Sequence, residues 1–443
     1  MATFIAEPQR HTPIFGEYDV IVLGGGPAGL VAAAVAGRAG HKVLLVERYG
    51  FLGGMGTAAG VTNFCGLYAN VHGEHVRVVR GMADELLDRI DRLGGLNEPH
   101  LVLKKILAQA YDVSAYKIAA DELLADCGVE ILFHAVAVGV AMHEKALIDA
   151  LIVETKSGRM AARGRLFVDG SGDGDLAAWA GAPFEKGDGR GNMLYPSTMF
   201  RLNGVDPVAA GEAWLSIPKL MEEAEREGKF SFPRKGAIVR PQKHPGEWRV
   251  NITQLRKIDG TAIDGVDAKS LSDGEMQGRG QIREAYRFLQ TVPGFENSYI
   301  VDIAPQVGIR ETRRIMGEYV LTEDDVLTCA SFDDSIGRNG WPIETHTSGD
   351  VVWKFPDIPN VRGYNELPYR MIVPQLIENL FVVGRCASMT HLGQSAARVS
   401  GACFAMGEAA GTAASLALRT NATPRKLDRS EIARALRAQG ALL

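Results

Sequence analysis

A glycine-rich turn near the N-terminus, within "YDVIVLGGGPAGLVAAAVAGRAGHKVLLVE", constrains the fold more than any other feature of this sequence. A run rich in valine and isoleucine leads into the glycines, an alanine-rich segment begins at about Pro27, and a second apolar run ends at Glu47. This order predicts a strand, a helix and a second strand, which together form a βαβ unit. Such a unit is typical of an α/β fold with a parallel sheet.

The glycines of this unit have a specific spacing, since Gly24, Gly26 and Gly29 fill the pattern G-x-G-x-x-G. In dinucleotide-binding folds the first glycine forms the tight turn, the second lets a pyrophosphate approach the helix N-terminus, and the third lets helix and strand pack closely. Glu47 ends the second strand, where an acidic side chain accepts hydrogen bonds from the adenosine ribose. We therefore expect a dinucleotide site, and the alternative is a glycine-rich turn in an ordinary α/β unit.

A second glycine cluster favours FAD over NAD, which the first motif alone does not distinguish, and a third indicates how the sheet continues. The segment "RYGFLGGMGTAAG" follows Glu47 directly and has the length and flexibility to wrap the far half of a longer cofactor. The segment "RLFVDGSGDGDLAAWAGAP" predicts a strand over 165–169, a glycine turn, and a helix from about Asp173. This strand would bring the chain back to the dinucleotide sheet.

The intervening and following segments suggest how the chain leaves this sheet and returns to it. Two helices are expected, over about Met82 to Leu93 and about Leu103 to Cys127. A strand-rich segment follows, with hairpin signals around Lys145 and at Ser157, which predicts an inserted β-meander. The apolar strand Asn379 to Gly384 and a long alanine-rich helix behind it would complete the sheet.

Four separated motifs resemble one known family. They are "VDGSGDGDLA" followed by "AGAP", the L-G-G-x-x-T after Glu47, "GIRETRRIMGEY" at 308–319, and the tail "NLFVVGR" with its later A-x-R and G-x-A-A-G. In these the sequence resembles the FAD-dependent oxidoreductase family, whose FAD domain is of the glutathione reductase and fumarate reductase flavoprotein kind. The resemblance extends from about Tyr18 to Leu416, and it implies FAD bound by a discontinuous domain.

The resemblance and the motifs together give a set of cofactor-binding residues. We predict Gly24, Gly26, Pro27, Ala28, Gly29, Glu47, Arg48, Gly53, Gly54, Met55, Thr57, Val136, Gly172, Asp173, Gly384, Arg385, Ser395 and Ala396. Arg385 stands where many such flavoproteins carry an acid that binds the ribityl chain, so the ribityl contact is left open. The loop from Arg48 to Gly60 has no histidine, and we therefore expect the FAD to be non-covalently bound.

The predicted fold class is α/β, with a Rossmann-like FAD domain of the glutathione reductase type, an inserted β-meander and a second α+β substrate domain. The predicted boundaries are 16–194 for the first part of the FAD domain, 195–374 for the substrate domain, 375–420 for the returning strand and helix, and 421–443 for a last helix.

Composition excludes several classes of partner. The net charge of −5 argues against a nucleic-acid partner, and the five cysteines are odd in number and contain no C-x-x-C pair, which favours free thiols and no metal site. The N-terminus lacks the basic and apolar regions of a signal peptide, so a cytoplasmic location is expected. Residues 20–37 carry no charge, but their glycines and proline argue against a membrane span. A homo-oligomer is left open.

The expected chemistry is hydride transfer at the flavin. Only one G-x-G-x-x-G unit is present, and without a C-x-x-C pair a pyridine-nucleotide disulfide reductase is not favoured, so the electron donor or acceptor is left open. We expect a dehydrogenase or reductase that acts on a small, anionic organic substrate. A flavin-dependent monooxygenase and a flavin-bearing subunit of a larger complex are the alternatives.

The candidate catalytic residues are Arg310, Arg398, Tyr369, Arg370 and His391. Arg310 and Arg398 would hold the anion, because guanidinium geometry suits a carboxylate, and His391 would move the proton. Arg310 is expected at a strand end, whereas Arg313 and Arg314 are expected to pair with neighbouring acids. Tyr369 and Arg370 precede the returning strand and are expected where the two domains meet. His346 lies in a polar segment, "IETHTSGD", and is expected at the surface.

Overall fold

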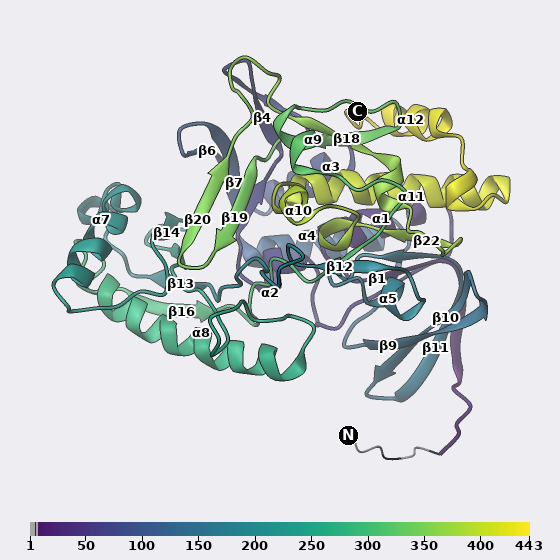
Figure 1. The fold of residues 1–443 in the computed structure, drawn as a ribbon, viewed down its shortest axis with the longest axis horizontal. Coiled ribbons are helices and arrows are strands. Elements are labelled where there is room, and N and C mark those ends of the chain that lie inside the picture. The colour runs from purple at the N-terminus through teal and green to yellow at the C-terminus, as the bar shows by residue number, and fades with distance from the viewer. Residues whose placement is uncertain (1–4, 6–7) are drawn as a thin grey trace.

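The computed structural model describes residue 5 and residues 8–443. Its largest element is a seven-stranded sheet in the order β8-β2-β1-β11-β10-β9, with β22 also paired to β11 (Figure 1). The strands are β1 Ile14–Leu23, β2 Val43–Val46, β8 Glu130–Leu132, β9 Val136–Glu144, β10 Leu147–Thr155, β11 Gly158–Asp169 and β22 Leu380–Val382.

The two halves of this sheet differ in strand direction. β8, β2, β1, β11 and β22 run parallel, whereas β10 pairs antiparallel with β9 on one side and with the first part of β11 on the other. The turns of this β-meander lie at 145–146 and 156–157, as the hairpin signals predicted. β22 joins the sheet beside the end of β11, so the predicted return of the chain is confirmed.

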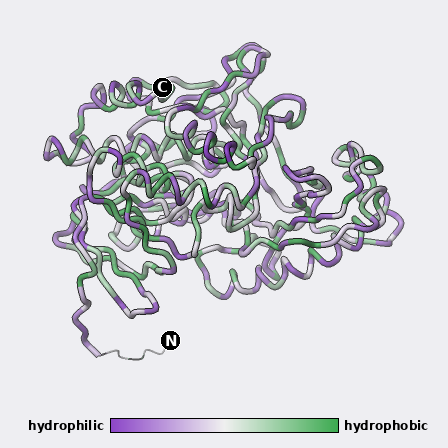
Figure 2. The backbone as a smooth tube through the Cα atoms, turned by 180° about the vertical axis from the view of Figure 1, so that it is seen from behind, coloured by the Kyte–Doolittle hydropathy of each residue, from purple (hydrophilic) through white to green (hydrophobic). Residues whose placement is uncertain are grey.

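Apolar side chains that alternate along the strands create the layers. Val20 and Val22 of β1 face a core shared with the helices α1 Pro27–Arg38, α3 Met82–Arg92, α4 Val113–Asp126 and α11 Ser400–Thr420. Ile21 and Leu23 point to the other face, where the meander and α5 Asp175–Trp179 cover them. The helices, the parallel sheet and the meander thus form three layers, and Figure 2 shows where hydrophobic stretches lie along the backbone.

One predicted helix is shorter than expected. The segment Leu103 to Cys127 divides into the strand β7, Ile106–Tyr111, and the helix α4. Asp112 separates them, because its side chain accepts a hydrogen bond from the backbone N–H of Ala115 and caps the helix. The predicted helix at Met82 is confirmed by α3.

A second region carries a four-stranded antiparallel sheet of its own, in the order β14-β15-β13-β16. Its strands are β13 Phe200–Asn203, β14 Ile238–Pro241, β15 Trp248–Asn251 and β16 Tyr299–Ile303. The helices α7 Ala213–Arg226 and α8 Ala268–Leu289 pack on it around a separate apolar core, and Figure 1 shows this region beside the three-layered one. The predicted fold class, with a Rossmann-like α/β part and an α+β part, is confirmed, and the boundaries at 195 and 374 stay a prediction.

The remaining elements are short. The strands are β3 Asn63–Cys65, β4 Tyr68–Val71, β5 Glu74–Arg77, β6 Leu96–Val102, β12 Phe184–Lys186, β17 Arg313–Ile315, β18 Ser335–Asn339, β19 Ile343–Thr347, β20 Asp350–Lys354 and β21 Asn365–Pro368. The helices are α2 Met55–Ala58, α6 Pro207–Ala210, α9 Glu323–Leu327, α10 His391–Ala397 and α12 Arg429–Ala438, with 3-10 turns η1 Tyr369–Ile372, η2 Gly384–Cys386 and η3 Pro424–Lys426.

The alanine-rich tail forms two helices, because α10 ends before Arg398 and α11 begins at Ser400. The later helix packs along α1, and its residues from Gly401 to Leu416 are almost all buried. Its small residues therefore serve close packing against α1 and not against the sheet, since a Cβ on Gly407 or Gly411 would overlap a backbone carbonyl oxygen of α1.

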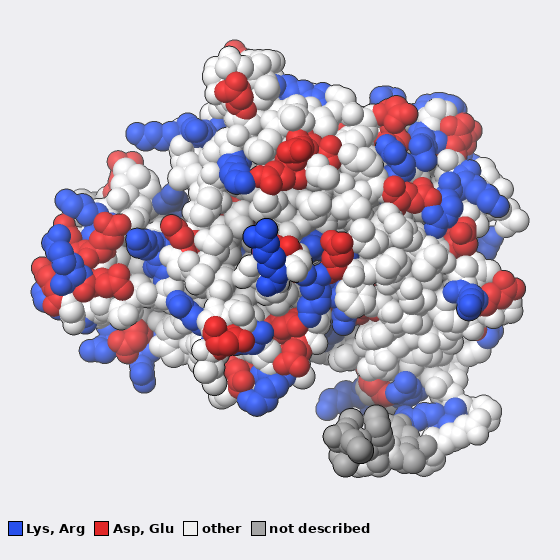
Figure 3. Space-filling view, in the orientation of Figure 1, with Lys and Arg blue, Asp and Glu red and all other residues white. Residues whose placement is uncertain are grey.

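On the face shown in Figure 3, acidic and basic side chains are interspersed. Among the described residues, no helix combines the length and the apolar character that a membrane crossing requires.

Candidate active site

The predicted dinucleotide motif lies at one end of a cavity of about 340 Å³. Gly24, Gly26, Pro27 and Ala28 line it at the point where β1 ends and α1 begins. Gly24 and Gly29 are in close contact, since a Cβ on Gly29 would overlap the carbonyl oxygen of Gly24. The first turn of α1 has neither a capping side chain nor an acidic residue, so its N–H groups are available to an anion.

Glu47 faces the same cavity from the end of β2. One carboxylate oxygen accepts a hydrogen bond from the N–H of Gly25 at 2.8 Å, and the other accepts from the N–H of Tyr49 at 3.0 Å. Burial raises the pKa of this carboxyl, and hydroxyl donors in the cavity would counter that effect. The residues present therefore fit the ribose and the pyrophosphate of FAD.

Seven further predicted cofactor residues line the cavity: Arg48, Gly54, Met55, Val136, Gly172, Gly384 and Arg385. Arg385 donates to the carboxylate of Asp173 at 3.0 Å, and the hydroxyl of Thr312 donates to the same carboxylate at 2.8 Å. Asp173 thus balances the charge of Arg385 behind the cavity wall.

Six predicted cofactor residues support the cavity from outside its lining. They are Gly29, Gly53, Thr57, Asp173, Ser395 and Ala396. Gly53 donates its N–H to the carbonyl of Gly25, and the Thr57 hydroxyl donates to the carbonyl of Leu52. The Ser395 hydroxyl donates to the carbonyl of Leu392, within α10. A direct contact of these six residues with FAD therefore has no support from their positions.

The cavity continues from the dinucleotide motif to a group of charged side chains. We call this end the arginine compartment and define it by Arg249, Arg310, Arg398, Glu344 and His346, all of which line the cavity. Burial lowers the pKa of Arg310, the charge of Arg398 lowers it further, and the charge of Glu344 opposes them.

Arg310 is 6% exposed and has only neutral partners. Its guanidinium donates to the carbonyl of Tyr195 at 2.7 Å and to the hydroxyl of Ser197 at 2.8 Å. Burial, followed by the charge of Arg398, lowers its pKa well below the ordinary value. The residue lies just before β17 and not at a strand end, so that part of the prediction is wrong.

Arg249 and Arg398 also have no charged partner among the described residues. Arg249, on β15, is 4% exposed, its Nη1 faces the sulfur of Met199, and its Nε has no hydrogen-bond partner. Burial lowers its pKa to about 10. Arg398 lies between α10 and α11, and its Nε and Nη2 have no partner. Within the described residues, Arg249, Arg310 and Arg398 form no ion pair with a carboxylate.

Glu344 and His346 stand two residues apart on β19 and therefore share one face of the strand. The Nε2 of His346 lies 3.1 Å from a carboxylate oxygen of Glu344, and the indole N–H of Trp341 donates to the other at 3.0 Å. Burial alone would raise the pKa of Glu344, but His346, Arg398 and Trp341 together lower it to about 2. The expectation that His346 lies at the surface is wrong, since it is 4% exposed.

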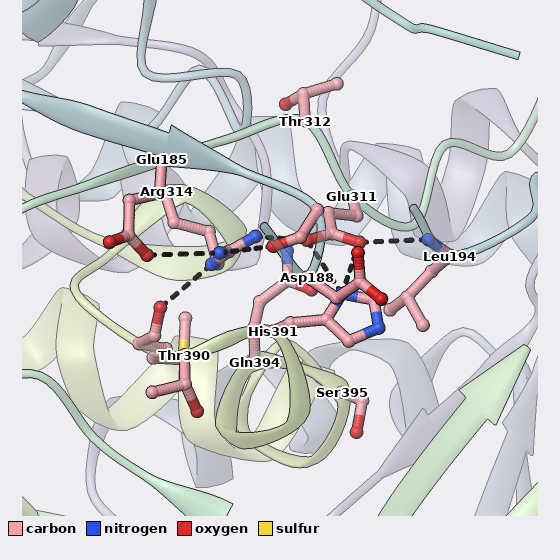
Figure 4. Close-up of polar contacts among 12 residues, drawn as sticks. Glu185, Asp188, Leu194, Glu311, Thr312, Arg314, Thr390, His391, Gln394 and Ser395 are labelled. Atoms are coloured by element: carbon pink, nitrogen blue, oxygen red, sulfur yellow. Dashed lines mark hydrogen bonds and ion pairs between the residues drawn. The ribbon is translucent and has the colours of Figure 1, made fainter. Parts of the chain in front are cut away.

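The structure places His391 outside the cavity lining. Its Nδ1 lies 2.8 Å from a carboxylate oxygen of the fully buried Glu311, which also pairs with Arg314 and accepts from the N–H of Leu194 (Figure 4). This network ties α10 to the segment around β17. It satisfies the buried charges of Glu311 and Arg314, so a structural role accounts for His391, and its predicted exchange of a proton with substrate has no support from its position.

Tyr369 and Arg370 also lie outside the lining. The Tyr369 hydroxyl donates to the carbonyl of Pro424, and Arg370 pairs with Asp334 at 2.9 Å. Their predicted contact with substrate therefore has no support from the structure. Arg314 pairs with Glu311 as predicted, whereas Arg313 pairs with Asp175, an acid more distant in sequence.

A family model described as FAD dependent oxidoreductase matches residues 19–436. The chain is 54% identical over 46 residues to a dihydrolipoyl dehydrogenase of Trypanosoma brucei brucei and 51% identical over 45 residues to a cinnamate reductase of Clostridium sporogenes. These matches cover 10% of this chain, and 10% and 7% of those relatives.

Two solved structures are similar over most of the chain. A geranylgeranyl bacteriochlorophyll reductase-like protein from Thermoplasma acidophilum is 14% identical with a TM-score of 0.48, over 96% of this chain and 84% of that one. A myxobacterial chondrochloren halogenase is 15% identical with a TM-score of 0.47, over 95% and 78%.

Proposed function

Because the chain belongs to the FAD-dependent oxidoreductase family, we propose that it transfers a hydride between non-covalently bound FAD and a small, anionic organic substrate. FAD, when bound, supplies the two-electron donor or acceptor. The proposal is carried by one observation: the cavity that begins at the dinucleotide motif ends at the buried Arg249 and Arg310 and the half-buried Arg398, none of which pairs with a carboxylate of the described residues.

The dinucleotide end of the cavity would hold the cofactor through three groups. The first turn of α1 would bind the pyrophosphate through its free N–H groups, and Glu47 would accept the ribose hydroxyls. Gly384 and Arg385 lie where β22 ends, on the wall of the same cavity. The arginine compartment would then receive the substrate.

The charge of the arginine compartment favours an anion. Three guanidinium groups face one carboxylate, that of Glu344, and burial lowers the pKa of Arg249 and Arg310. A buried charge without a counterion is unfavourable by several kcal/mol, and an anionic ligand would relieve this cost. The unpartnered Nε and Nη2 of Arg398 offer the parallel pair of donors that a carboxylate accepts.

Apolar and aromatic side chains surround these charges. Phe64, Tyr111, Met199, Trp341 and Trp353 line the cavity, and the two indoles are in T-shaped contact at 5.9 Å. Such walls exclude water, which strengthens the attraction between an arginine and a carboxylate. A substrate with an organic body and at least one carboxylate is therefore the class that this cavity suits.

Anaerobic titration of the purified holo-protein tests the proposal. Organic carboxylates and their neutral amides are added to oxidised enzyme, and the flavin absorbance is followed; dithionite-reduced enzyme is tested in the reverse direction. We expect carboxylates alone to perturb or bleach the flavin, and Arg310→Lys, Arg249→Lys and Arg398→Lys to weaken this binding at least tenfold with FAD retained. The control is Arg163→Lys, an exposed arginine on β11.

Two outcomes would contradict this function. If carboxylates and amides change the flavin absorbance equally, and the arginine variants bind carboxylates as tightly as the wild type, the cavity has no anion site. Hydroxylated product that requires NAD(P)H and oxygen would instead support a monooxygenase, and a stable complex with no turnover by the isolated chain would support a flavin-bearing subunit.

A further inference from the structure

His346 is the one histidine that lines the cavity within the described part of the chain. Its side chain makes a single hydrogen bond, through Nε2 to Glu344, and no described protein group bonds to its Nδ1. The imidazole lies in the arginine compartment, where the substrate carboxylate is proposed to bind. A ring nitrogen without a protein partner is therefore present beside the proposed substrate site.

The protonation of this ring follows from its partner. Glu344 is ionised at neutral pH, because its neighbours lower its pKa to about 2, and an ionised carboxylate only accepts hydrogen bonds. His346 must therefore donate from Nε2, and in the neutral ring this leaves a lone pair on Nδ1. A carboxylate that fixes the tautomer of a histidine in this way also holds the ring in one orientation.

The groups that face the ring come from three segments. Glu344 lies on the same strand, Arg310 precedes β17, and Arg398 lies between α10 and α11. Burial, followed by the charge of Arg310, lowers the pKa of His346 well below its usual value, and the smaller opposing effect of Glu344 does not restore it. At neutral pH the ring is thus uncharged and able to accept a proton.

We propose that His346 is the general base that takes the hydroxyl proton of a hydroxy acid, and that Glu344 is the residue that positions it. This inference rests on the proposed function and assigns its substrate class. The carboxylate of the hydroxy acid is held by the arginines, and its hydroxyl donates a hydrogen bond to Nδ1 of His346.

The charges of the compartment favour a hydroxy acid over two other anions. An amino acid carries an ammonium group near neutral pH, and three arginines would repel it. An unsaturated acid must receive a proton on carbon when it is reduced, and a neutral imidazole is a weak proton donor for that step. A hydroxyl group is uncharged and has a proton to give, so it matches both the charge and the protonation of the site.

The bonds balance without a further reactant. With FAD bound, the cofactor would accept the hydrogen of the substrate C–H bond together with both electrons of that bond, which is the two-electron oxidation that the proposed function requires. The O–H bond breaks, its proton goes to Nδ1 of His346, and its electron pair forms the C=O bond. The products are a 2-oxo acid, or another oxo acid, and an imidazolium ion paired with Glu344, which loses its proton to solvent afterwards.

Stopped-flow reduction of the holo-enzyme by a panel of hydroxy acids tests the proposal, with amino acids and unsaturated acids as comparisons. We expect hydroxy acids to reduce the flavin and His346→Gln to slow this reduction by about 100-fold or more, the range of general base catalysis. FAD content and the dissociation constant of the hydroxy acid should change by less than a few-fold. The control is His75→Gln, an exposed histidine on β5.

Two readouts separate proton transfer from a merely structural role. Added imidazole should restore part of the reduction rate of His346→Ala. The wild-type rate should stay flat from pH 9 down to pH 6, because the pKa of His346 lies well below its ordinary value of 6.5, and Glu344→Gln should alter this profile. The pH measurement requires no variant, so it stands even if a variant fails to fold.

Several results would overturn the inference. They are a wild-type rate in His346→Gln, a fall in the wild-type rate centred near pH 6.5, or flavin reduction by amino acids alone. If carboxylate binding is intact, any of these results shows that His346 is not the general base, and it does not contradict the proposed function. If no organic anion affects the flavin, both the proposed function and the assignment of His346 as general base are wrong.

Discussion

Replacing Glu408 with glutamine should remove a pH-dependent loss of stability. Glu408 lies on α11, 3% exposed, and its carboxylate accepts a hydrogen bond from the N–H of Met82 at 3.3 Å, at the start of α3. Burial is the main cause that raises its pKa to about 8, and the charges of Asp84 and Glu85 add to it. The carboxyl group is therefore protonated in the folded protein at neutral pH.

The magnitude follows from the two pKa values. In the unfolded chain the group titrates near 4.5, so between 4.5 and about 8 the folded protein binds more protons than the unfolded chain. The contribution of the Glu408 carboxyl group to the free energy of unfolding is therefore fully present below pH 4.5. It decreases as the pH rises and is lost once the pH has passed through 8. A pKa difference of this size corresponds to at most about 5 kcal/mol. For a chain of this length that unfolds cooperatively, this is roughly 5 °C in Tm.

Thermal unfolding of the holo-protein at pH 5, 7 and 9 measures this effect. Glu408→Gln keeps the shape and an acceptor oxygen for Met82, so its Tm should be close to that of the wild type at pH 5 and higher by several degrees at pH 9. Glu122→Gln, at an exposed position of α4, controls for the loss of one negative charge. A Tm difference that stays constant from pH 5 to pH 9 would refute the reasoning.

Three further changes probe how the cofactor site is built. Gly407→Ala should lower both the Tm and the ratio of flavin to protein absorbance, because a Cβ there would overlap the carbonyl of Ala28 in the first turn of α1. Asn379→Ala should destabilise the protein by about 3 kcal/mol in denaturant unfolding, because Asn379 makes buried hydrogen bonds that join β22 to β10 and β11. Arg385→Met should weaken FAD binding in a fluorescence titration more than the double change with Asp173→Asn, because the single change leaves a buried carboxylate unpaired.

The parallel sheet was predictable because its signals are local. The glycine turn, the acid at Glu47 and the apolar run of β22 each stand within a few residues of the element they define. The segment 103–112 was harder, since a short apolar run suits a strand as well as a helix. The pairing of β7 with β3 and β6 makes this segment a strand, and a local sequence pattern carries no information on that pairing.

The arginine compartment was only partly predictable, because its residues meet through the fold. Arg310 and Arg398 were identified from their motifs, whereas Arg249 lies on β15 and carries no sequence signal of its own. Glu344 and His346 did carry a sequence signal, because polar residues two positions apart in an alternating segment are typical of one face of a strand. The turn residues that follow, however, favour a loop.

His391 precedes a long alanine-rich stretch, and this pattern predicts a helix whose N-terminus and neighbouring side chains face the flavin. The chain instead breaks at Arg398, and the helix that points at the cavity is α11. Residues 398–400 therefore line the cavity, whereas His391 does not line it and contacts Glu311 through Nδ1. A break of two residues inside an alanine-rich stretch has no marker in composition.

The pairing of α1 with α11 sets an order of events during synthesis. The ribosome synthesises α1 early and α11 late. At a synthesis rate of about 5–20 residues per second, the apolar face of α1 stays without its partner helix α11 for roughly tens of seconds. Until then that face is a target for chaperones and for aggregation. Since β22 and α11 also complete the walls around Gly384, capture of the cofactor becomes a late, post-translational event, and cells that overproduce the chain faster than they supply FAD should accumulate insoluble protein.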